Sequence, residues 1–570
     1  MRIKHIDIKN FRSIEGISFD VPDVCAIVGA NNVGKSNILE AIKRVLGTSW
    51  LNVNSFSQDD IFLRDFDRSV EITCYVDPGI PYAKAKGCDP TEIAALRFEY
   101  TRYKIGEKKG QPRLEQQCLN AKGEVPMVMT KPPRKGSKPE FGPIVGIPSD
   151  IRDQVPLIYI GTNRSLKEQL PGARYSLLRT MFESINRDLQ DPSRTVLVPQ
   201  GDGTKKQVPI GKRFNHLMAA AITLLKTDEF LAVESAIKKS VLEQLNLDPT
   251  ADTDRLDLFF TPLSTMDFYK TLDLLIKEDG FSISAQEVGE GMQNAIVLGV
   301  LQAFEQTQKQ GAILIIEEPE MFLHPQMQRS LYKTLRRIGE KNQVIYTTHS
   351  PHFVAVPDYN EVLRVSKDGG RTNVQFSSLA TDPKRREKLI KELDPERNEL
   401  FFARRVLIVE GDTEKLAFPE YAKRLGFDLD RQGATVVEVG GKRNLKELAN
   451  IAISFGIPTG MVYDRDSSDF AGHAKEEAEY NAMLDGLAQG NTVRVWRFDA
   501  NYEDHLRSTL TDSVYQQLCQ EFPQMSKPIR ARLIANKAGT TIPPTVKEIL
   551  GWLVGTPASS ENSAGGHNNT

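Results

Sequence analysis

Residues 29–36 read Gly29-Ala-Asn-Asn-Val-Gly-Lys-Ser36, which matches the pattern G-x-x-x-x-G-K-[ST] at every fixed position. An apolar run, Val24–Val28, precedes this loop and an amphipathic segment, Lys35–Leu46, follows it, so we expect a strand, a glycine-rich loop and a helix in succession. Backbone N–H groups of such a loop point into one concavity at the helix N-terminus and bind phosphate oxygens there. The sequence therefore predicts a site for ATP and magnesium. Its predicted contacts are Gly29, Asn31, Asn32 and Gly34 in the loop, the Lys35 ammonium on the β- and γ-phosphates, and the Ser36 hydroxyl on magnesium.

The composition is that of an ordinary globular protein, with 40% hydrophobic and 26% charged residues, and it argues against a disordered, collagen-like or disulfide-scaffold chain. The 570 residues suggest three or four domains of roughly 150 residues each. A total of 73 Lys and Arg against 75 Asp and Glu gives a net charge of −2. This balance excludes a uniformly basic coat for nucleic acid but not a local basic groove.

We expect neither membrane insertion nor secretion. The N-terminal residues are charged from Arg2 onward and lack an apolar signal core, and the longest apolar runs, such as 295–301, fall short of the roughly 20 residues that a membrane helix needs. The five cysteines form no CxxC pair, so we expect reduced thiols rather than disulfides or a cysteine zinc site. The sequence therefore predicts a cytoplasmic protein.

Two further apolar runs end in residues suited to ATP hydrolysis. Residues 313–320, Ile-Leu-Ile-Ile-Glu-Glu-Pro-Glu, predict a buried strand after which Glu317 holds magnesium through water and Glu318 polarises the attacking water. Adjacent carboxylates at the end of an apolar strand are costly to hold unless a cation is nearby. Residues 344–350, Val-Ile-Tyr-Thr-Thr-His-Ser, predict another strand, and His349 at its end is a candidate sensor of the γ-phosphate.

Four motifs together resemble the ABC-type ATPase heads of the structural-maintenance-of-chromosomes and recombination-repair group. They are Ile8-Lys-Asn-Phe-Arg-Ser13, the glycine-rich loop, Glu-Glu-Pro-Glu and Thr-His-Ser. The resemblance implies that Arg12 lies by the phosphates, that Glu317 and Glu318 form the Walker B pair, and that His349 is the switch histidine. It also implies a Q-loop glutamine, for which Gln58 is the candidate.

The signature loop of such heads has an incomplete counterpart in this chain. The pattern is S-G-x-G-Q or near it, and the best match is Val288-Gly-Glu-Gly-Met-Gln293. Val288 replaces the serine, so a hydroxyl contact to the γ-phosphate is missing, although backbone amides near Gly289 and Gly291 at a helix N-terminus still suit a phosphate. Because the signature of one head caps the nucleotide of a neighbouring head, we expect a homodimer or a larger oligomer with an even number of chains.

A second group of acidic residues follows two apolar runs late in the chain. A strand predicted at 405–409 is followed by Glu410, a turn and Glu414, and a later strand is followed by Asp464 and Asp466. Asp464 and Asp466 are two residues apart and face the same way, and the two glutamates converge on the same edge across the tight turn. Hard oxygen ligands without His or Cys favour Mg²⁺ or Mn²⁺.

The pattern E-G-x-x-E followed by D-x-D resembles the Toprim domain shared by primases, topoisomerases and certain nucleases. An ABC head followed by Toprim on one chain resembles the OLD (overcoming lysogenisation defect) family of nucleases, which includes the nuclease subunit of Gabija-type antiphage systems. The resemblance spans about residues 1–540. It implies that Glu410, Glu414, Asp464 and Asp466 bind two metal ions, with Glu410 and Asp464 counted as catalytic.

The same resemblance implies two further site residues. A third acidic cluster holds Glu503 as the best candidate metal ligand, with Asp499 and Asp504 as weaker alternatives. A late lysine near the scissile phosphate is also implied, and Lys537 fits its position. Two cations roughly 4 Å apart activate a water and stabilise the leaving oxygen in phosphodiester hydrolysis, which agrees with this set of ligands.

We interpret the chain as an α/β protein in which an ABC-type P-loop ATPase with a helical insertion is followed by a Toprim domain. The expected boundaries are 1–170 and 281–395 for the ATPase, 171–280 for an insertion that serves dimerisation, 396–555 for Toprim, and 556–570 for a disordered tail.

The expected function is that of an ATP-regulated, metal-dependent DNA endonuclease or nickase in antiphage defence. The alternative is an ATP-gated DNA-binding scaffold of the recombination-mediator type with a non-catalytic Toprim fold. A pure scaffold would not need Glu410, Asp464 and Asp466 together. DNA is the expected substrate, and the sequence leaves open whether the chain works alone, with a UvrD-like helicase, or with a retron-type reverse transcriptase and its DNA.

Overall fold

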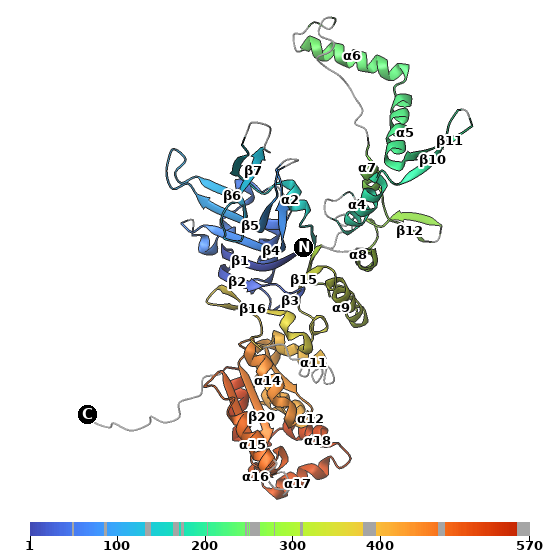
Figure 1. The fold of residues 1–570 in the computed structure, drawn as a ribbon. Coiled ribbons are helices and arrows are strands. Elements are labelled where there is room, and N and C mark those ends of the chain that lie inside the picture. The colour runs from blue at the N-terminus through green and yellow to red at the C-terminus, as the bar shows by residue number, and fades with distance from the viewer. Residues whose placement is uncertain are drawn as a thin grey trace. The chain divides into compact units, whose positions relative to one another are not determined.

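The computed structural model divides the chain into two compact units (Figure 1). Unit 1 comprises Met1–Val155 and Gly311–Thr570, and unit 2 comprises Pro156–Gln310. The residues that the structure describes are 1–47, 51–65, 67–84, 88–131, 138–162, 170, 172, 176–201, 203–244, 248, 250, 263–278, 280–307, 312–379, 395–465 and 474–555. The tail expected at 556–570 lies outside these ranges.

The central sheet of unit 1 carries the glycine-rich loop. Its strands in this unit run in the order β17-β16-β3-β15-β14. Their bounds are Val24–Val28 (β3), Ile313–Glu317 (β14), Gln343–Thr348 (β15), Val362–Asp368 (β16) and Arg371–Gln375 (β17). β3 is parallel to β15 and β16, β14 is parallel to β15, and β17 is antiparallel to β16. Because the carboxyl ends of parallel strands meet at one edge, the loop after β3 lies beside the ends of β14 and β15.

A second sheet of unit 1 is antiparallel and supports the helix that follows the loop. Its order is β2-β1-β4-β5-β6. The bounds are Arg2–Phe11 (β1), Ile14–Asp20 (β2), Val70–Tyr82 (β4), Thr91–Arg102 (β5) and Pro112–Leu119 (β6). Helix α1 (Lys35–Leu46) packs against β1, β4 and β5. Its residues Ile38, Leu39, Ile42 and Val45 are buried, as the amphipathic pattern predicts.

Short elements complete the first part of unit 1. They are the 3-10 turns η1 (Val53–Ser55), η2 (Gln58–Asp60) and η3 (Phe62–Arg64), the hairpin β7 (Met127–Lys131) with β8 (Glu140–Pro143), and α2 (Ser149–Asp153). Helix α9 (Pro325–Gly339) packs against β15 and β3 of the central sheet. Downstream, η5 (Pro351–Phe353), η6 (Val356–Glu361), α11 (Pro395–Asn398) and η7 (Glu399–Phe402) lie between the central sheet and the last sheet in the sequence.

The last sheet of unit 1 is fully parallel, with the order β19-β18-β20-β21. Its strands are Arg405–Val409 (β18), Ala434–Glu438 (β19), Thr459–Asp464 (β20) and Val493–Phe498 (β21). The helices of this part are α12 (Asp412–Arg424), α13 (Leu429–Gln432), α14 (Leu445–Ser454), α15 (Ala474–Asp485), α16 (Tyr502–Leu510), α17 (Asp512–Glu521), α18 (Lys527–Asn536) and α19 (Pro544–Leu553). Helix α12 packs against α18 and α19. The core between sheet and helices includes Leu407, Phe418, Trp496 and Trp552.

Unit 2 is mainly helical. It contains α4 (Leu177–Gln190), α5 (Ile210–Leu225), α6 (Asp228–Gln244), α7 (Thr265–Lys270) and α8 (Glu290–Thr307), with the strands β9 (Leu157–Ile160), β10 (Thr195–Pro199), β11 (Lys205–Pro209), β12 (Leu275–Glu278) and β13 (Phe281–Ser284). The unit is wider than the insertion expected at 171–280, because β9 and α8 cluster with it. In the described part of the chain, no helix has both the length and the apolar composition of a membrane span.

Candidate nucleotide and metal sites

The glycine-rich loop has the backbone geometry of a phosphate cradle. Gly29 has φ 150°, Asn32 has φ 62° and Gly34 has φ 109°, so the chain curls back on itself between β3 and α1. A Cβ at Gly29 would lie 2.2 Å from the Val365 carbonyl oxygen, and one at Gly34 would lie 2.3 Å from Thr372 Oγ1. Only glycine allows β16 and β17 to approach this closely. The loop is therefore fixed by its neighbours as well as by its own sequence.

Lys35 occupies the centre of this cradle. Its ammonium donates to the carbonyl oxygens of Gly29 and Ala30, both at 2.9 Å. Burial lowers the pKa of Lys35 to about 8, and Glu318 and Glu320 partly offset this effect. Lys35 is therefore a buried cation at the floor of the loop, close to the carboxylates that follow β14.

The expected Walker B and switch residues come together at the ends of β14 and β15. Glu318 has φ 45°, a left-handed conformation that costs energy for a non-glycine residue and that is common at functional sites. Its N–H donates to the Thr347 carbonyl oxygen at 3.0 Å, and its Oε1 lies 3.7 Å from His349 Nε2. Burial and the charge of Lys35 lower the pKa of His349 below its ordinary value, and Glu318 partly offsets this effect. Glu317, at the last position of β14, is half-buried.

A third carboxylate of this group, Glu320, was not singled out by the sequence. Its Oε1 accepts the backbone N–H of His349 at 2.5 Å, whereas its buried Oε2 has no hydrogen-bond partner among the described residues. Burial raises the pKa of Glu320 despite this hydrogen bond. Glu320 thus ties the loop after β14 to the switch histidine.

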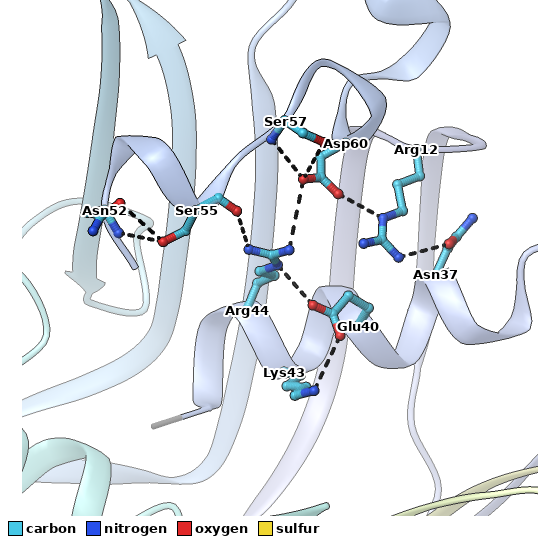
Figure 2. Close-up of polar contacts among 9 residues, drawn as sticks. All are labelled: Arg12, Asn37, Glu40, Lys43, Arg44, Asn52, Ser55, Ser57 and Asp60. Carbon is cyan, nitrogen blue, oxygen red and sulfur yellow. Dashed lines mark hydrogen bonds and ion pairs between the residues drawn. The ribbon is translucent and has the colours of Figure 1, made fainter. Parts of the chain in front are cut away.

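Arg12 lies at the other side of the loop, in the turn between β1 and β2. It too has a left-handed backbone, with φ 51°. Its Nε donates to Asp60 Oδ1 at 2.9 Å and its Nη1 to Asn37 Oδ1 at 3.4 Å (Figure 2). Asn37 follows Ser36 on α1. Gln58, the Q-loop candidate, is the exposed first residue of η2, in the turn that ends at Asp60.

The signature candidate lies in unit 2. Val288 and Gly289 precede α8, and Gly291 lies in the first turn of that helix. Gln293 Nε2 donates to the carbonyl oxygens of Gln286 and Val288, which closes the turn before the helix. The backbone amides at the start of α8 are therefore arranged as at any helix N-terminus.

The acidic residues of the second predicted site gather at the carboxyl edge of the parallel sheet. Glu410 follows β18, and Asp464 ends β20. The Asp464 N–H donates to Glu410 Oε2 at 3.3 Å. Glu414 lies in the first turn of α12 and Glu503 in the first turn of α16. Burial raises the pKa of Glu414 to about 7, and the charges of Glu410 and Glu503 add to this effect.

One lysine, Lys527, lies among these carboxylates. Its Nζ is 2.9 Å from Glu503 Oε2. Burial lowers the pKa of Lys527, but Glu503, Asp464 and Glu414 outweigh burial and raise this pKa above its ordinary value. Lys537, the lysine that fitted by position, instead pairs with Glu521, with Nζ to oxygen distances of 2.5 and 2.6 Å. The structure therefore places Lys527, at the start of α18, beside Glu503 of the acidic edge and pairs Lys537 with Glu521.

The weaker acidic candidates have other partners. Asp499 is almost fully exposed and pairs with Arg465 at 3.3 Å. Asp504 accepts from the Asn501 side chain at 2.8 Å and pairs with Arg507. Asp499 precedes α16, and Asp504 lies in the first turn of that helix.

The residues present fit a hard divalent cation. Among the described residues, no group of three or more His, Cys, Asp or Glu side chains is close enough to form a complete metal site, and Asp466 lies outside those residues. However, the buried Glu503 Oε1 has no hydrogen-bond partner in the described part of the chain. An unsatisfied buried carboxylate oxygen is costly, and a bound cation removes that cost. Carboxylate oxygens are the donors that Mg²⁺ and Mn²⁺ prefer.

Unit 1 thus joins a P-loop ATPase head to a parallel sheet with an acidic edge, and the comparisons agree with this class. Residues 1–120 and 157–354 match the AAA ATPase domain family, which is more than half of the chain, so the chain belongs to that family. Residues 401–466 match the TOPRIM domain of overcoming lysogenization defect protein-like proteins. These two matches and the OLD nuclease relatives confirm the resemblance to the OLD family and the α/β fold class that the sequence indicated.

Three relatives match along most of their length. The chain is 29% identical over 501 residues to the OLD nuclease of Thermus scotoductus, covering 85% of this chain and 86% of the relative. It is 24% identical over 507 residues to the Old nuclease of Escherichia phage P2, covering 82% and 77%. It is 22% identical over 457 residues to Endonuclease GajA of Bacillus cereus, covering 77% and 71%.

Proposed function

We propose that the protein is an ATP-regulated, divalent-metal-dependent DNA endonuclease or nickase that acts in the cytoplasm in defence against phage. The observation that carries the proposal is the acidic edge of the parallel sheet, where Glu503, Asp464 and Glu414 lie near the Lys527 ammonium and Glu410 accepts the Asp464 N–H. All three relatives are named as nucleases, and one of them as an endonuclease. All five cysteines are free, as expected of a reducing compartment.

These carboxylates and Asp466 would hold Mg²⁺ or Mn²⁺, which when bound activates water and neutralises charge on the scissile phosphate. The contribution of the chain itself is to hold the ligands in register at one edge of the sheet. Glu410 and Asp464 are held together by the Asp464 N–H. The Lys527 ammonium supports the same reaction as a donor to a phosphate oxygen, once DNA competes with Glu503 for it.

Contacts between the ATPase head and the Toprim sheet support regulation by ATP. Asn398, which is buried at the end of α11, donates from Nδ2 to the carbonyl oxygens of Pro351 and Val354, both at 2.9 Å, and accepts from the Val356 N–H at 3.2 Å. These backbone groups belong to the segment that follows His349. A movement of the segment that follows His349 would therefore displace α11 through these hydrogen bonds.

From α11 the contacts continue to the acidic edge. Arg397 Nη2 lies 3.2 Å from Glu438 Oε1 at the end of β19. Glu438 Oε2 accepts the Gly440 N–H at 2.7 Å, and the Gly441 N–H donates to the Glu410 carbonyl oxygen at 2.9 Å. Hydrogen bonds and neighbouring residues thus connect the segment after His349 to Glu410, and this connection supports coupling between the two sites.

A second connection runs along β16 and β17. Arg364, on β16, donates to the carbonyl oxygens of Ala403 and Phe455 at 3.1 and 3.4 Å. Gln375, on β17, donates to the Ser454 carbonyl oxygen at 2.9 Å. The same two strands pack against the glycine-rich loop, so they support a link between nucleotide occupancy and the Toprim part.

Exposed apolar side chains on α5 and α6 support a homodimer. They are Leu217, Leu224 and Leu225 on α5, and Leu231, Val233, Ile237 and Val241 on α6. An apolar surface of this kind is typical of a protein–protein interface. A second copy of the chain would bury this apolar surface. It would also supply the signature loop of a neighbouring head, which the ATPase site of a single head lacks.

Incubation of supercoiled plasmid with the full chain tests the proposal. We expect nicked or linear product with Mg²⁺ or Mn²⁺ and none with EDTA, and we expect ATP to change the rate. Binding without cleavage under every metal condition would instead favour the DNA-binding scaffold.

A pair of matched variants tests the lysine assignment. Lys527→Met should abolish cleavage, because it removes the ammonium that pairs with Glu503 at the acidic edge, whereas Lys537→Met should cut normally. The reverse result would restore Lys537 as the lysine of the site.

A further inference from the structure

Asp60 is a buried carboxylate between two arginines, next to the nucleotide loop (Figure 2). Its Oδ1 accepts from Arg12 Nε at 2.9 Å, and its Oδ2 lies 3.9 Å from Arg44 Nη2. The N–H of Ser57 also donates to Oδ2, at 3.1 Å. A carboxylate that is only 5% exposed remains ionised when such donors surround it.

Asp60 fixes the backbone of Arg12 as well as its side chain. The Arg12 N–H donates to the Asp60 carbonyl oxygen at 3.0 Å. This bond holds Arg12 in its left-handed conformation, which an arginine does not adopt without support. With Nε on Asp60 and Nη1 on Asn37, the guanidinium has one orientation, and its Nη2 has no hydrogen-bond partner among the described residues.

The orientation of Arg12 is tied to the glycine-rich loop by a chain of side chains. Asn37 Nδ2 donates to Ser13 Oγ at 2.7 Å, and Ser13 Oγ lies 2.7 Å from Thr372 Oγ1. Thr372 Oγ1 in turn donates to the Val33 carbonyl oxygen at 2.8 Å. Arg12 is therefore held in a fixed position relative to the loop that would carry the phosphates.

We propose that Asp60 is a positioning residue for the ATPase reaction, which holds the Arg12 guanidinium ready for the nucleotide phosphates and does not touch the nucleotide itself. The inference rests on the proposed role of Arg12 at the phosphates. It also gives a reason for the contact of Ser57 with Asp60, because the same carboxylate anchors the turn that begins with Gln58.

Steady-state ATP hydrolysis by the full chain, with KM and kcat measured separately, tests this inference. Arg12→Ala should weaken ATP use by roughly tenfold in kcat/KM, the size expected for the loss of a charged hydrogen bond. Asp60→Asn keeps nearly the same side-chain shape but lacks the charge, and it should lower kcat/KM by a comparable factor. Because both changes disable the same guanidinium, the double variant should be no worse than Arg12→Ala alone.

A matched control stands one residue away. Asp59 is exposed and pairs with Arg64 at 2.8 Å, so Asp59→Asn makes the same chemical change outside the network and should keep parental KM and kcat. Arg12→Lys keeps the charge but cannot reach Asp60, Asn37 and a phosphate together, so it should lose nearly as much as Arg12→Ala. If Asp60→Asn does not fold, Arg12→Lys serves as the test in its place.

The outcomes separate the role of Arg12 from the role of Asp60. Parental kinetics in Arg12→Ala would remove the role of Arg12 and the inference with it. Impaired kinetics in Arg12→Ala with parental kinetics in Asp60→Asn or Arg12→Lys would overturn the role of Asp60 alone. A lower melting temperature of Asp60→Asn with unchanged KM and kcat would show a structural role only, and additive losses in the double variant would likewise overturn positioning.

Discussion

Replacement of Glu414 by Gln should stabilise the metal-free protein, and the gain should grow with pH. Glu414 is 5% exposed and lies near the charges of Glu410 and Glu503, and burial is the largest cause of its raised pKa. Gln keeps the shape of the side chain and removes the charge. The variant therefore removes a cost that the wild-type chain bears whenever Glu414 is ionised in the folded state.

The magnitude follows from the two pKa values. The pKa is about 7 in the folded protein against an ordinary 4.5. Because the folded state binds the proton more tightly, wild-type stability falls as pH rises through this interval. At about 1.36 kcal/mol per pKa unit, the cost of ionised Glu414 is under about 1 kcal/mol at pH 5 and reaches about 3 kcal/mol at pH 8. The advantage of Glu414→Gln should follow the same course.

Chemical denaturation of the full chain in EDTA, at pH 5 and pH 8, measures this difference. With saturating Mg²⁺ or Mn²⁺ the order should reverse, because the cation stabilises the ionised wild type and loses a ligand in the variant. Equal stability of the two proteins at pH 8 in EDTA, or a difference that does not change with pH, would refute the electrostatic account of the acidic edge.

Three other predictions concern the ATPase head and its junction with Toprim. Because the pKa of Lys35 is about 8, ATP affinity measured by equilibrium binding should fall roughly tenfold from pH 7 to pH 9, and a parental profile in Lys35→Met would contradict this cause. Val288→Ser should raise ATP hydrolysis several-fold in the dimer, through a hydrogen bond to the γ-phosphate of about 1.5–3 kcal/mol; an unchanged rate would mean that 288–293 is not the signature. Asn398→Asp keeps the acceptor for the Val356 N–H but loses both donated bonds, so plasmid cleavage should respond less to ATP, and a full response would exclude this junction as the link.

Local sequence patterns predicted the elements that carry the two sites. The strand, loop and helix at 24–46 follow from an apolar run, glycines and an amphipathic period, and the structure has β3 and α1 at those bounds. The approach of Glu410 to Asp464 was predictable for a similar reason, since Glu410 follows β18 and Asp464 ends the neighbouring parallel strand β20. Such features depend on periodicity and on a simple rule of sheet geometry.

The residues that the sequence did not identify depend on tertiary packing. Lys527 reaches the acidic edge because α18 packs against α12, whereas Lys537, ten positions later, faces Glu521, and no local pattern distinguishes the two lysines. Asp59 and Asp60 are likewise equivalent in sequence, yet one is exposed and the other is buried on Arg12. The role of Glu320 depends on the placement of the loop after β14 beside His349.

Cleavage of DNA at the acidic edge is the central proposal, and Asp464→Asn tests it most directly. This change keeps the shape of the side chain and removes one charge and one hard ligand, while Asp499→Asn makes the same change at an exposed residue that pairs with Arg465. In plasmid cleavage with Mg²⁺ or Mn²⁺, Asp464→Asn should give no product and should still hydrolyse ATP at the parental rate, and Asp499→Asn should cut normally. Parental cleavage by Asp464→Asn would contradict the account and place the nuclease site elsewhere.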